Sequence, residues 1–181
     1  MIYLDHAAAT PLDEHVLAAM QPYFSYQFYN PSAPYAPAIA VRRDYDQAKA
    51  TIARAIGVKG DELIVTAGAT ESINLAFRSI GGHVIVPAIE HHAVLEAAKS
   101  GEHTIIPVNE QGLVDTEEIA RAIRPETRLV SVALANNELG TIQPLRDIAE
   151  VVREERQRRL DKGDKTPIYL HSDASQGVGQ L

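Results

Sequence analysis

Four short stretches of this 181-residue chain combine polar or charged side chains with small residues, as ligand-binding turns do. They are centred on Thr70, His91, Asn137 and Asp173. Each follows an apolar run that predicts a β-strand, and ligands of open α/β sheets bind beyond the carboxyl ends of the strands. The spacing therefore predicts that the four stretches meet at one rim of a sheet.

The last of these stretches, Ile168–Leu181, carries the most specific chemistry. Asp173 follows a short β-type run, and Gln176 comes three residues later in a glycine-rich turn. A carboxylate in that position can pair with a buried cation, and a protonated pyridine nitrogen is one candidate. The alternative is that Asp173 only caps or turns the chain after the strand. This stretch alone leaves both interpretations open.

The stretch Ala67–Ser72 joins a predicted strand to a predicted helix. Free backbone N–H groups at a helix N-terminus, the helix dipole and the Thr70 hydroxyl could together hold a phosphate. The alternative is a capping box in which Thr70 is the N-cap. The stretch matches neither a P-loop nor a G-x-G-x-x-G fingerprint, so nucleotide binding through those motifs is disfavoured.

Two further stretches carry side chains that could contact a flat ligand. His91 and His92 could ligate a metal, but successive residues usually point apart and no third ligand is evident, so zinc is disfavoured. A histidine here could instead stack on a heteroaromatic ring. Asn136 and Asn137 could bond a ligand oxygen or stabilise a turn. A phosphate cradle, a stacking ring, an amide and a carboxylate on one rim describe a pyridoxal-phosphate pocket.

Periodicity predicts the elements that must position these residues. Helices are expected from Asp13 to Phe24 and from Ala38 to Ile56, the second closed by Gly57, with a proline-rich loop between them. The later strands are continuous apolar runs, which is typical of a mainly parallel sheet flanked by helices on both faces. We therefore predict a single α/β domain over residues 1–181. The expected strands are 62–66, 83–86, 104–108, 128–134 and 168–170, and the helices between them are 70–77, 92–99, 116–123 and 144–159.

The composition excludes several classes of protein. A formal charge of −7, with no patch of Lys and Arg, argues against nucleic-acid binding. The chain has no cysteine, so it contains no disulfide, thiolate metal site or thiol nucleophile. No apolar run approaches the length of a membrane span, and the N-terminus has no signal-peptide pattern. We therefore predict a cytoplasmic protein without a membrane partner.

Six motifs, in order, give the chain a close resemblance to the N-terminal half of the cysteine desulfurases. These pyridoxal-phosphate enzymes belong to the class V aminotransferase family and supply sulfur for iron–sulfur cluster assembly. The resemblance implies a fold like part of the large domain of fold-type I pyridoxal-phosphate enzymes. It also points to the branch that includes the housekeeping and nitrogen-fixation desulfurases. The motifs are YLDHAAATP at 3–11, NPS at 30–32, TAGATESINLA at 66–76, EHHAVL at 90–95, NNELGTIQP at 136–144 and HSDASQGVG at 171–179.

The resemblance implies a role for each candidate residue. Asp173 would pair with the pyridine nitrogen and keep it protonated, so that the ring can accept electrons from the substrate carbanion. His91 would stack on the ring and take part in proton transfers, as the catalytic residue of this chain. The remaining implied contacts are to the cofactor phosphate, from Ala69 and Thr70, and near the phenolic oxygen of the ring, from Asn137 and Gln176.

The family converts L-cysteine to L-alanine and leaves a persulfide on an enzyme cysteine. In the family, the Schiff-base lysine, that cysteine and the arginine for the substrate carboxylate all lie beyond the Asp-Ala-x-Gln motif, and this sequence stops at Leu181. Tyr35 and Ala38 stand where relatives usually carry His and Gly. The chain has five lysines, none of which stands at the matching place: Lys49, Lys59, Lys99, Lys162 and Lys165.

We therefore expect this chain to be the front half of a cysteine desulfurase that binds pyridoxal phosphate non-covalently at best and is inactive alone. Homo-oligomerisation or a complementing C-terminal half is expected from the resemblance, and an iron–sulfur scaffold protein is a further expected partner. The alternatives are another class V enzyme, such as a selenocysteine lyase, and a non-catalytic interaction module that uses an unpaired sheet edge.

Overall fold

A computed structural model describes residues 2–179 of the chain. Their contacts divide the chain into two compact units, Met1–Val65 and Thr66–Leu181, and each unit is described by itself below. The candidate ligand-binding residues all belong to the second unit. The expectation of a single domain stays a prediction.

The first unit contains the helices α1, Glu14–Ser25, and α2, Ala36–Ala55, followed by a short 3₁₀ turn, η1, Gly60–Glu62. Asp13 is the N-cap of α1, and its side chain accepts a hydrogen bond from the backbone N–H of His15 at 2.8 Å. Gly57 has a φ of +75° just after α2, as expected for a glycine that ends a helix. Both predicted helices are confirmed.

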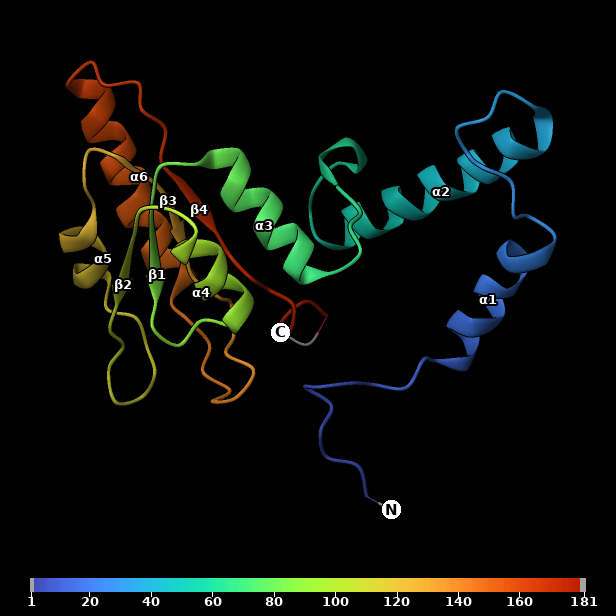
Figure 1. Cartoon of the computed structure of the whole chain (residues 1–181), viewed down its shortest axis with the longest axis horizontal. Coiled ribbons are helices and arrows are strands. Elements are labelled where there is room, and N and C mark those ends of the chain that lie inside the picture. The colour runs from blue at the N-terminus through green and yellow to red at the C-terminus, as the bar shows by residue number, and fades with distance from the viewer. Residues whose placement is uncertain (1, 180–181) are drawn as a thin grey trace. The chain divides into compact units, whose positions relative to one another are not determined.

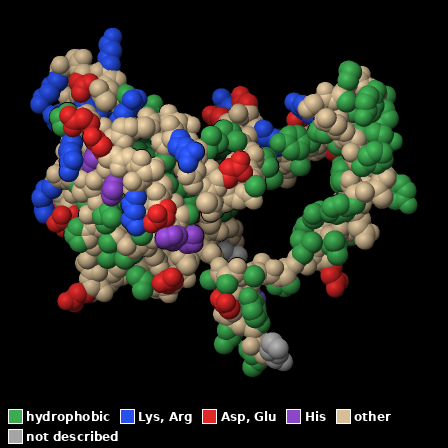
Figure 2. Space-filling model, viewed as in Figure 1, with side chains coloured by type: hydrophobic (Ala, Val, Ile, Leu, Met, Phe, Trp, Pro, Cys, Tyr) green, Lys and Arg blue, Asp and Glu red, His purple; other side chains and the backbone are tan. Residues whose placement is uncertain are grey.

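The apolar face predicted for α1 is present but is not buried. Val16, Leu17 and Met20 are 47%, 45% and 40% exposed, and Phe24 is 71% exposed. Figure 2 shows hydrophobic side chains along this part of the chain. None of the residues of α1 is buried by the part of the chain that the structure describes. The periodicity therefore predicted the helix correctly, but it did not indicate what buries the apolar face of the helix.

The second unit is a four-stranded parallel sheet with helices on both faces, which confirms the predicted fold class (Figure 1). The spatial order of the strands is β2-β1-β3-β4, so the chain crosses over between β2 and β3. The strands are β1 His83–Pro87, β2 His103–Ile106, β3 Thr127–Ser131 and β4 Tyr169–His171, and the helices are α3 Ala69–Ile80, α4 His92–Lys99, α5 Thr116–Ala122 and α6 Leu145–Asp161. None of the helices among residues 2–179 is long and apolar enough to cross a membrane.

Alternate side chains of β1 enter two separate hydrophobic cores. Val84 and Val86 pack in the core that includes residues of α3 and α4, whereas Ile85 packs in the core that includes residues of α5 and α6. Figure 1 shows these helix pairs on opposite faces of the sheet. Both faces of each central strand are covered, which explains why the strands read as continuous apolar runs.

One predicted strand, over residues 62–66, is wrong. The chain there ends the η1 turn and continues without a ladder partner among the described residues. Ile64 and Val65 are 70% and 60% exposed. A β-strand needs a neighbour to satisfy its backbone groups, so an apolar run alone does not make one.

A buried arginine holds α6 against the amino end of the sheet. Arg159 is only 2% exposed, and its Nε donates to a Glu155 carboxylate oxygen at 2.6 Å. Its terminal nitrogens donate to the carbonyl of Thr127, the first residue of β3, at 2.9 Å and to the carbonyl of Arg124, just before β3, at 3.0 Å. Arg158 shares the same carboxylate from an exposed position, and its hydrogen bond is the main reason that the pKa of Glu155 is lowered.

The two arginines predict very different mutational effects. Arg159→Leu would remove the buried cation beside Glu155 and leave the buried carbonyl of Thr127 without its side-chain donor, so we expect a loss of about 3 kcal/mol in the free energy of unfolding. Arg158→Leu removes only a solvent-exposed partner and should cost less than about 1 kcal/mol. Urea unfolding followed by circular dichroism measures both. Equal losses would contradict the anchoring role of Arg159.

Candidate functional site

The loops that follow the strands leave the sheet at one rim. All four strands are parallel, so their carboxyl ends share an edge, and Figure 1 shows these loops at the same end of the sheet. Helix α3 is joined to the amino end of β1 by Gly81 and Gly82, so its N-terminus lies toward the same rim. The predicted convergence of the four stretches on one rim is therefore present in the second unit.

A cavity of about 430 Å³ opens between the loops after β1 and β3, and it brings His91 and Asn137 together. Asn136 is one of its lining residues. Its Nδ2 donates to the carbonyl of Ile89 at 2.7 Å, which ties the two loops together. Its Oδ1 accepts from the backbone N–H groups of Glu138 at 2.9 Å and Leu139 at 2.8 Å. For Asn136 the turn interpretation is therefore right, whereas the neighbouring Asn137 is exposed beside the cavity.

A buried glutamine connects the loop after β3 to the loop that precedes α5. Gln143 donates to the carbonyl of Gly112 at 2.7 Å and accepts from the N–H of Val114 at 2.9 Å. Gly112 has a φ of +74°, and a Cβ at this position would lie 3.0 Å from a methyl group of Leu139. The wall of the cavity thus depends on contacts between loops far apart in the sequence, which the sequence did not reveal.

His91 begins α4 as its N-cap. Its Nδ1 accepts a hydrogen bond from the N–H of Ala93 at 3.1 Å. A neutral imidazole bonded in this way carries its proton on Nε2, so that nitrogen is the donor that remains for a ligand. His92 lies 4.0 Å from Glu96 on the helix surface, and no group of three possible metal ligands occurs among residues 2–179.

Ala69 and Thr70 line a second cavity, of about 580 Å³, at the N-terminus of α3. The N-cap of this helix is Gly68, so the interpretation of Thr70 as the N-cap is wrong. The backbone N–H groups of Ala69 and Thr70 come before the first hydrogen bond within the helix, so they are available to bind an anion. Arg78 also lines this cavity. The two cavities share no lining residue, so the structure does not join the predicted phosphate contacts and the His91 cavity in one pocket.

Asp173 combines a turn contact with an electrostatic influence on the site. It is half-buried, and its Oδ1 accepts from the N–H and the hydroxyl of Ser175 at 2.9 and 2.6 Å. Its negative charge acts to raise the pKa of Glu90 and of His171. The turn interpretation of Asp173 is therefore correct without excluding a ligand. Gln176 is exposed in the turn that follows.

The sequence did not single out Glu90 as a site residue, yet it is the buried acid of this rim. Its side chain reaches across to accept from the N–H of Ala133 at 2.7 Å, and it is 6% exposed. Its second oxygen, Oε2, has no hydrogen-bond partner among residues 2–179. Burial raises the pKa of Glu90 to about 7, and the nearby Asp173 adds to the increase. The sequence feature that could have pointed to Glu90 is its position between a buried strand and His91.

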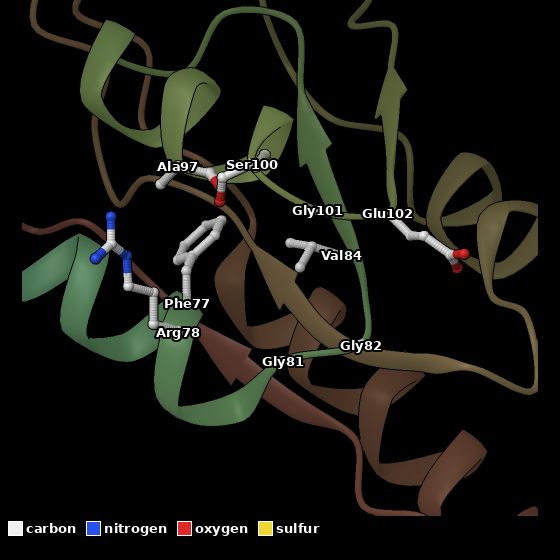
Figure 3. A pocket seen from close by; sticks show the side chains of 10 residues that line it. Phe77, Arg78, Gly81, Gly82, Val84, Ala97, Ser100, Gly101 and Glu102 are labelled. Atoms are coloured by element: carbon white, nitrogen blue, oxygen red, sulfur yellow. The ribbon is translucent and has the colours of Figure 1, made fainter.

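A third cavity, of about 340 Å³, lies at the opposite end of the sheet, where α3 and α4 end. Figure 3 shows the Phe77 ring facing Val84 and Ala97 there, while the charged ends of Arg78 and Glu102 point away. It lacks the convergent polar groups expected of a binding site. The carboxyl rim is therefore the candidate functional site.

The family comparison agrees with this fold and rim. Residues 2–180 match the model of the family described as aminotransferase class V. The chain belongs to this family. A cysteine desulfurase IscS of Dictyoglomus turgidum is 39% identical over 99% of the chain, and so is a protein named putative cysteine desulfurase IscS 1 of Bacillus subtilis. The chain covers 46% and 48% of these relatives, about half their length. Membership implies pyridoxal phosphate as the family's cofactor.

Solved structures of similar proteins share the fold. A structure titled "SspA in complex with cysteine" matches 97% of this chain with a TM-score of 0.86 and 36% identity, and the match covers 51% of that chain. A NifS-like protein matches 99% of this chain with the same TM-score and 31% identity, over 50% of that chain. The resemblance inferred from the six sequence motifs is thereby confirmed.

The adjacent asparagines give a matched test of which residue builds the site. Asn136→Ala removes the bond to Ile89 and the two bonds within the loop, so we expect a loss of about 2 kcal/mol in the free energy of unfolding. Asn137→Ala is expected to change it by less than about 0.5 kcal/mol. Thermal and urea unfolding measure both. A comparable loss for Asn137→Ala would show that it too is a structural residue.

The pKa of Glu90 predicts a pH-dependent stability. An ordinary Glu pKa is 4.5, so between pH 4.5 and 7 the folded chain keeps a proton that the unfolded chain has lost. Stability should therefore fall as the pH rises through this window. We expect the unfolding free energy of the wild type, minus that of Glu90→Gln, to decline by about 3 kcal/mol in total and to level off above pH 7.

The difference between the two proteins isolates Glu90. Burial lowers the pKa of His83 and of His171, so both histidines destabilise the folded chain in acid, but they do so equally in both proteins. Urea unfolding at intervals of half a pH unit gives the difference. A flat difference would show that Glu90 is ionised in the folded chain at pH 5.

Proposed function

We propose that this chain is the cofactor-binding part of a pyridoxal-phosphate-dependent cysteine desulfurase. The observation that carries the proposal is the convergence, on one rim, of the Asp173 carboxylate with the cavity between His91 and Asn137. The sequence similarity to desulfurases spans the whole chain but about half of each relative, so the activity of a whole enzyme is part of the proposal.

The chemistry of the rim fits this cofactor. The N–H groups at the start of α3 suit a phosphate, the exposed His91 ring suits a flat heteroaromatic ligand, and Asp173 suits a protonated ring nitrogen. The rim also holds two buried polar atoms without partners among the described residues, Oε2 of Glu90 and Oγ of Ser172. When bound, pyridoxal phosphate supplies an electron-accepting ring that stabilises a carbanion next to the substrate nitrogen.

The residues of this chain would bind and orient that ring. Asp173 would hold a proton on the pyridine nitrogen, with Ser175 fixing the direction of its carboxylate. His91 would cover one face of the ring and offer Nε2 for proton transfer, because its Nδ1 is engaged with α4. Asn137 and Gln176 would donate toward the phenolic oxygen. L-cysteine is the proposed substrate, by similarity to the desulfurases.

We propose that the cofactor is held without a covalent bond to these 181 residues. The lysines of the second unit lie away from the rim. Lys99 is in the last turn of α4 beside Glu96, and Lys162 and Lys165 come after α6, before β4 begins. The anchoring lysine, the reactive cysteine and the substrate-binding arginine would come from outside these residues. A second copy or a complementing segment would supply them, and a scaffold protein for iron–sulfur clusters would receive the sulfur.

A titration with pyridoxal phosphate tests the proposal. We expect saturable binding, followed by absorbance, that Asp173→Ala weakens at least tenfold because a charge-assisted bond is lost. Ser175→Ala is the matched control, since it removes the hydroxyl partner of Asp173 but keeps the backbone N–H partner and the carboxylate, and it should weaken binding less than about threefold.

Borohydride reduction and peptide mass analysis complete this experiment. No reduced adduct is expected on any of the five lysines. An adduct on one specific lysine would refute the non-covalent proposal. Equal affinity in the wild type and in Asp173→Ala would refute the assigned site.

A further inference from the structure

The strands β1 and β3 separate at the candidate site. Their paired residues end with Ile85 opposite Val130, whereas β3 continues beside the β4 segment through bonds from the N–H groups of Val132 and Leu134. Successive N–H groups of a strand point to opposite sides, so the N–H of Ala133 points toward the β1 side. None of the strands within residues 2–179 accepts its hydrogen bond there, and the Glu90 carboxylate does so instead.

Glu90 is therefore a side-chain replacement for a missing strand contact, placed where the rim opens. Gln or protonated Glu could make this contact without a charge. An ionised carboxylate would be buried with no cation beside it, since none of the ion pairs among the described residues includes Glu90. Burying an unpaired charge is costly, so the neutral form is favoured.

The titratable groups around Glu90 add no compensating positive charge. From the end of β4 come Asp173, whose charge opposes ionisation of Glu90, and His171, whose pKa is lowered by burial so that it is neutral near pH 7. From the loop after β1 come the exposed His91 and His92, and from the loop after β3 comes the exposed Glu138. Oε2 of Glu90 has no partner among residues 2–179 that would stabilise a negative charge.

We propose that Glu90 is a positioning residue of the cofactor site: by accepting from the N–H of Ala133, it fastens the chain after β3 to the loop after β1, next to the segment that carries Asp173. This inference rests on the proposed function and deepens it. It assigns a role to a residue outside the predicted ligand contacts, one that fixes the gap between the loops that carry His91 and Asn137.

The role has a consequence for ligand binding. Pyridoxal phosphate is an anion overall at neutral pH, because its phosphate and phenolic oxygens outweigh the pyridinium charge. When Glu90 ionises, its buried negative charge adds to that of the half-buried Asp173 and repels this anion. The affinity should therefore fall as Glu90 loses its proton, whereas Gln at this position keeps the bond to Ala133 and never acquires a charge.

The experiment compares the dissociation constants of the wild type and Glu90→Gln for pyridoxal phosphate between pH 5.5 and 8.5. The ionisations of the ligand affect both proteins equally, so their ratio reports Glu90. We expect a ratio near 1 at the acid end and a wild type that binds about three- to tenfold more weakly at the alkaline end. Glu138→Gln is the matched control, because it removes an exposed carboxylate beside the same cavity, and its ratio should not vary with pH.

Two further measurements separate positioning from a merely structural role. Glu90→Ala removes the bond to Ala133 and should weaken binding at every pH, while the conservative Glu90→Gln restores it at low pH. Carbon-13 NMR of the Glu90 carboxyl group, recorded without ligand, should show titration near neutrality and a shift to lower pH in Asp173→Asn.

The outcomes distinguish the two proposals. A pH-independent ratio in proteins that bind pyridoxal phosphate, or titration of Glu90 near its ordinary pKa, would overturn the positioning role and leave the proposed function intact. A wild type that binds no pyridoxal phosphate would overturn the proposed function, and the positioning role with it.

Discussion

The rim of this sheet depends on one constraint: backbone groups that run out of strand partners must still be hydrogen-bonded. Where β1 and β3 separate, side chains take over this task. Glu90 accepts from Ala133, and Asn136 donates to the carbonyl of Ile89. Behind them, Gln143 bonds both a carbonyl and an N–H of the loop that precedes α5. These hydrogen bonds connect the loops and thereby fix the distance between the two walls of the cavity.

The same constraint explains why structural and ligand-facing residues alternate along the rim. Glu90 and Asn136 turn inward to satisfy the backbone, and the residue after each of them, His91 and Asn137, borders the cavity. Residue types alone do not tell which residue of a pair is structural and which faces the ligand, since either asparagine could be the ligand contact. The geometry assigns the inward role to one member of each pair, and the ligand-facing role of the other follows as the proposal.

Much of the fold was predictable, because helices and buried strands impose periods that a sequence displays locally. The sheet strands β1 to β4 and the helices around them were predicted to within a few residues. The strand expected at 62–66 failed because pairing depends on a distant neighbour. Glu90 and Gln143 were missed for the same reason: their partners lie 43 and about 30 residues away. Turn residues such as Asp173 stayed ambiguous, since one carboxylate can serve a turn and a ligand at once.

Two buried glutamates show what makes the rim different from the rest of the unit. Glu155 is 8% exposed, yet its pKa is lowered, because Arg158 and Arg159 both bond its carboxylate. Glu90 is 6% exposed, and its burial raises its pKa to about 7, with no ion pair among the described residues to offset the increase. At Glu155 the bonded arginines outweigh the cost of burying a charge, whereas at Glu90 that cost is not offset. At the amino end of the sheet, arginines neutralise the buried acid for stability. At the carboxyl rim, residues 2–179 form no ion pair with Glu90 or Asp173, so we expect the charge of Asp173 to be available to a ligand.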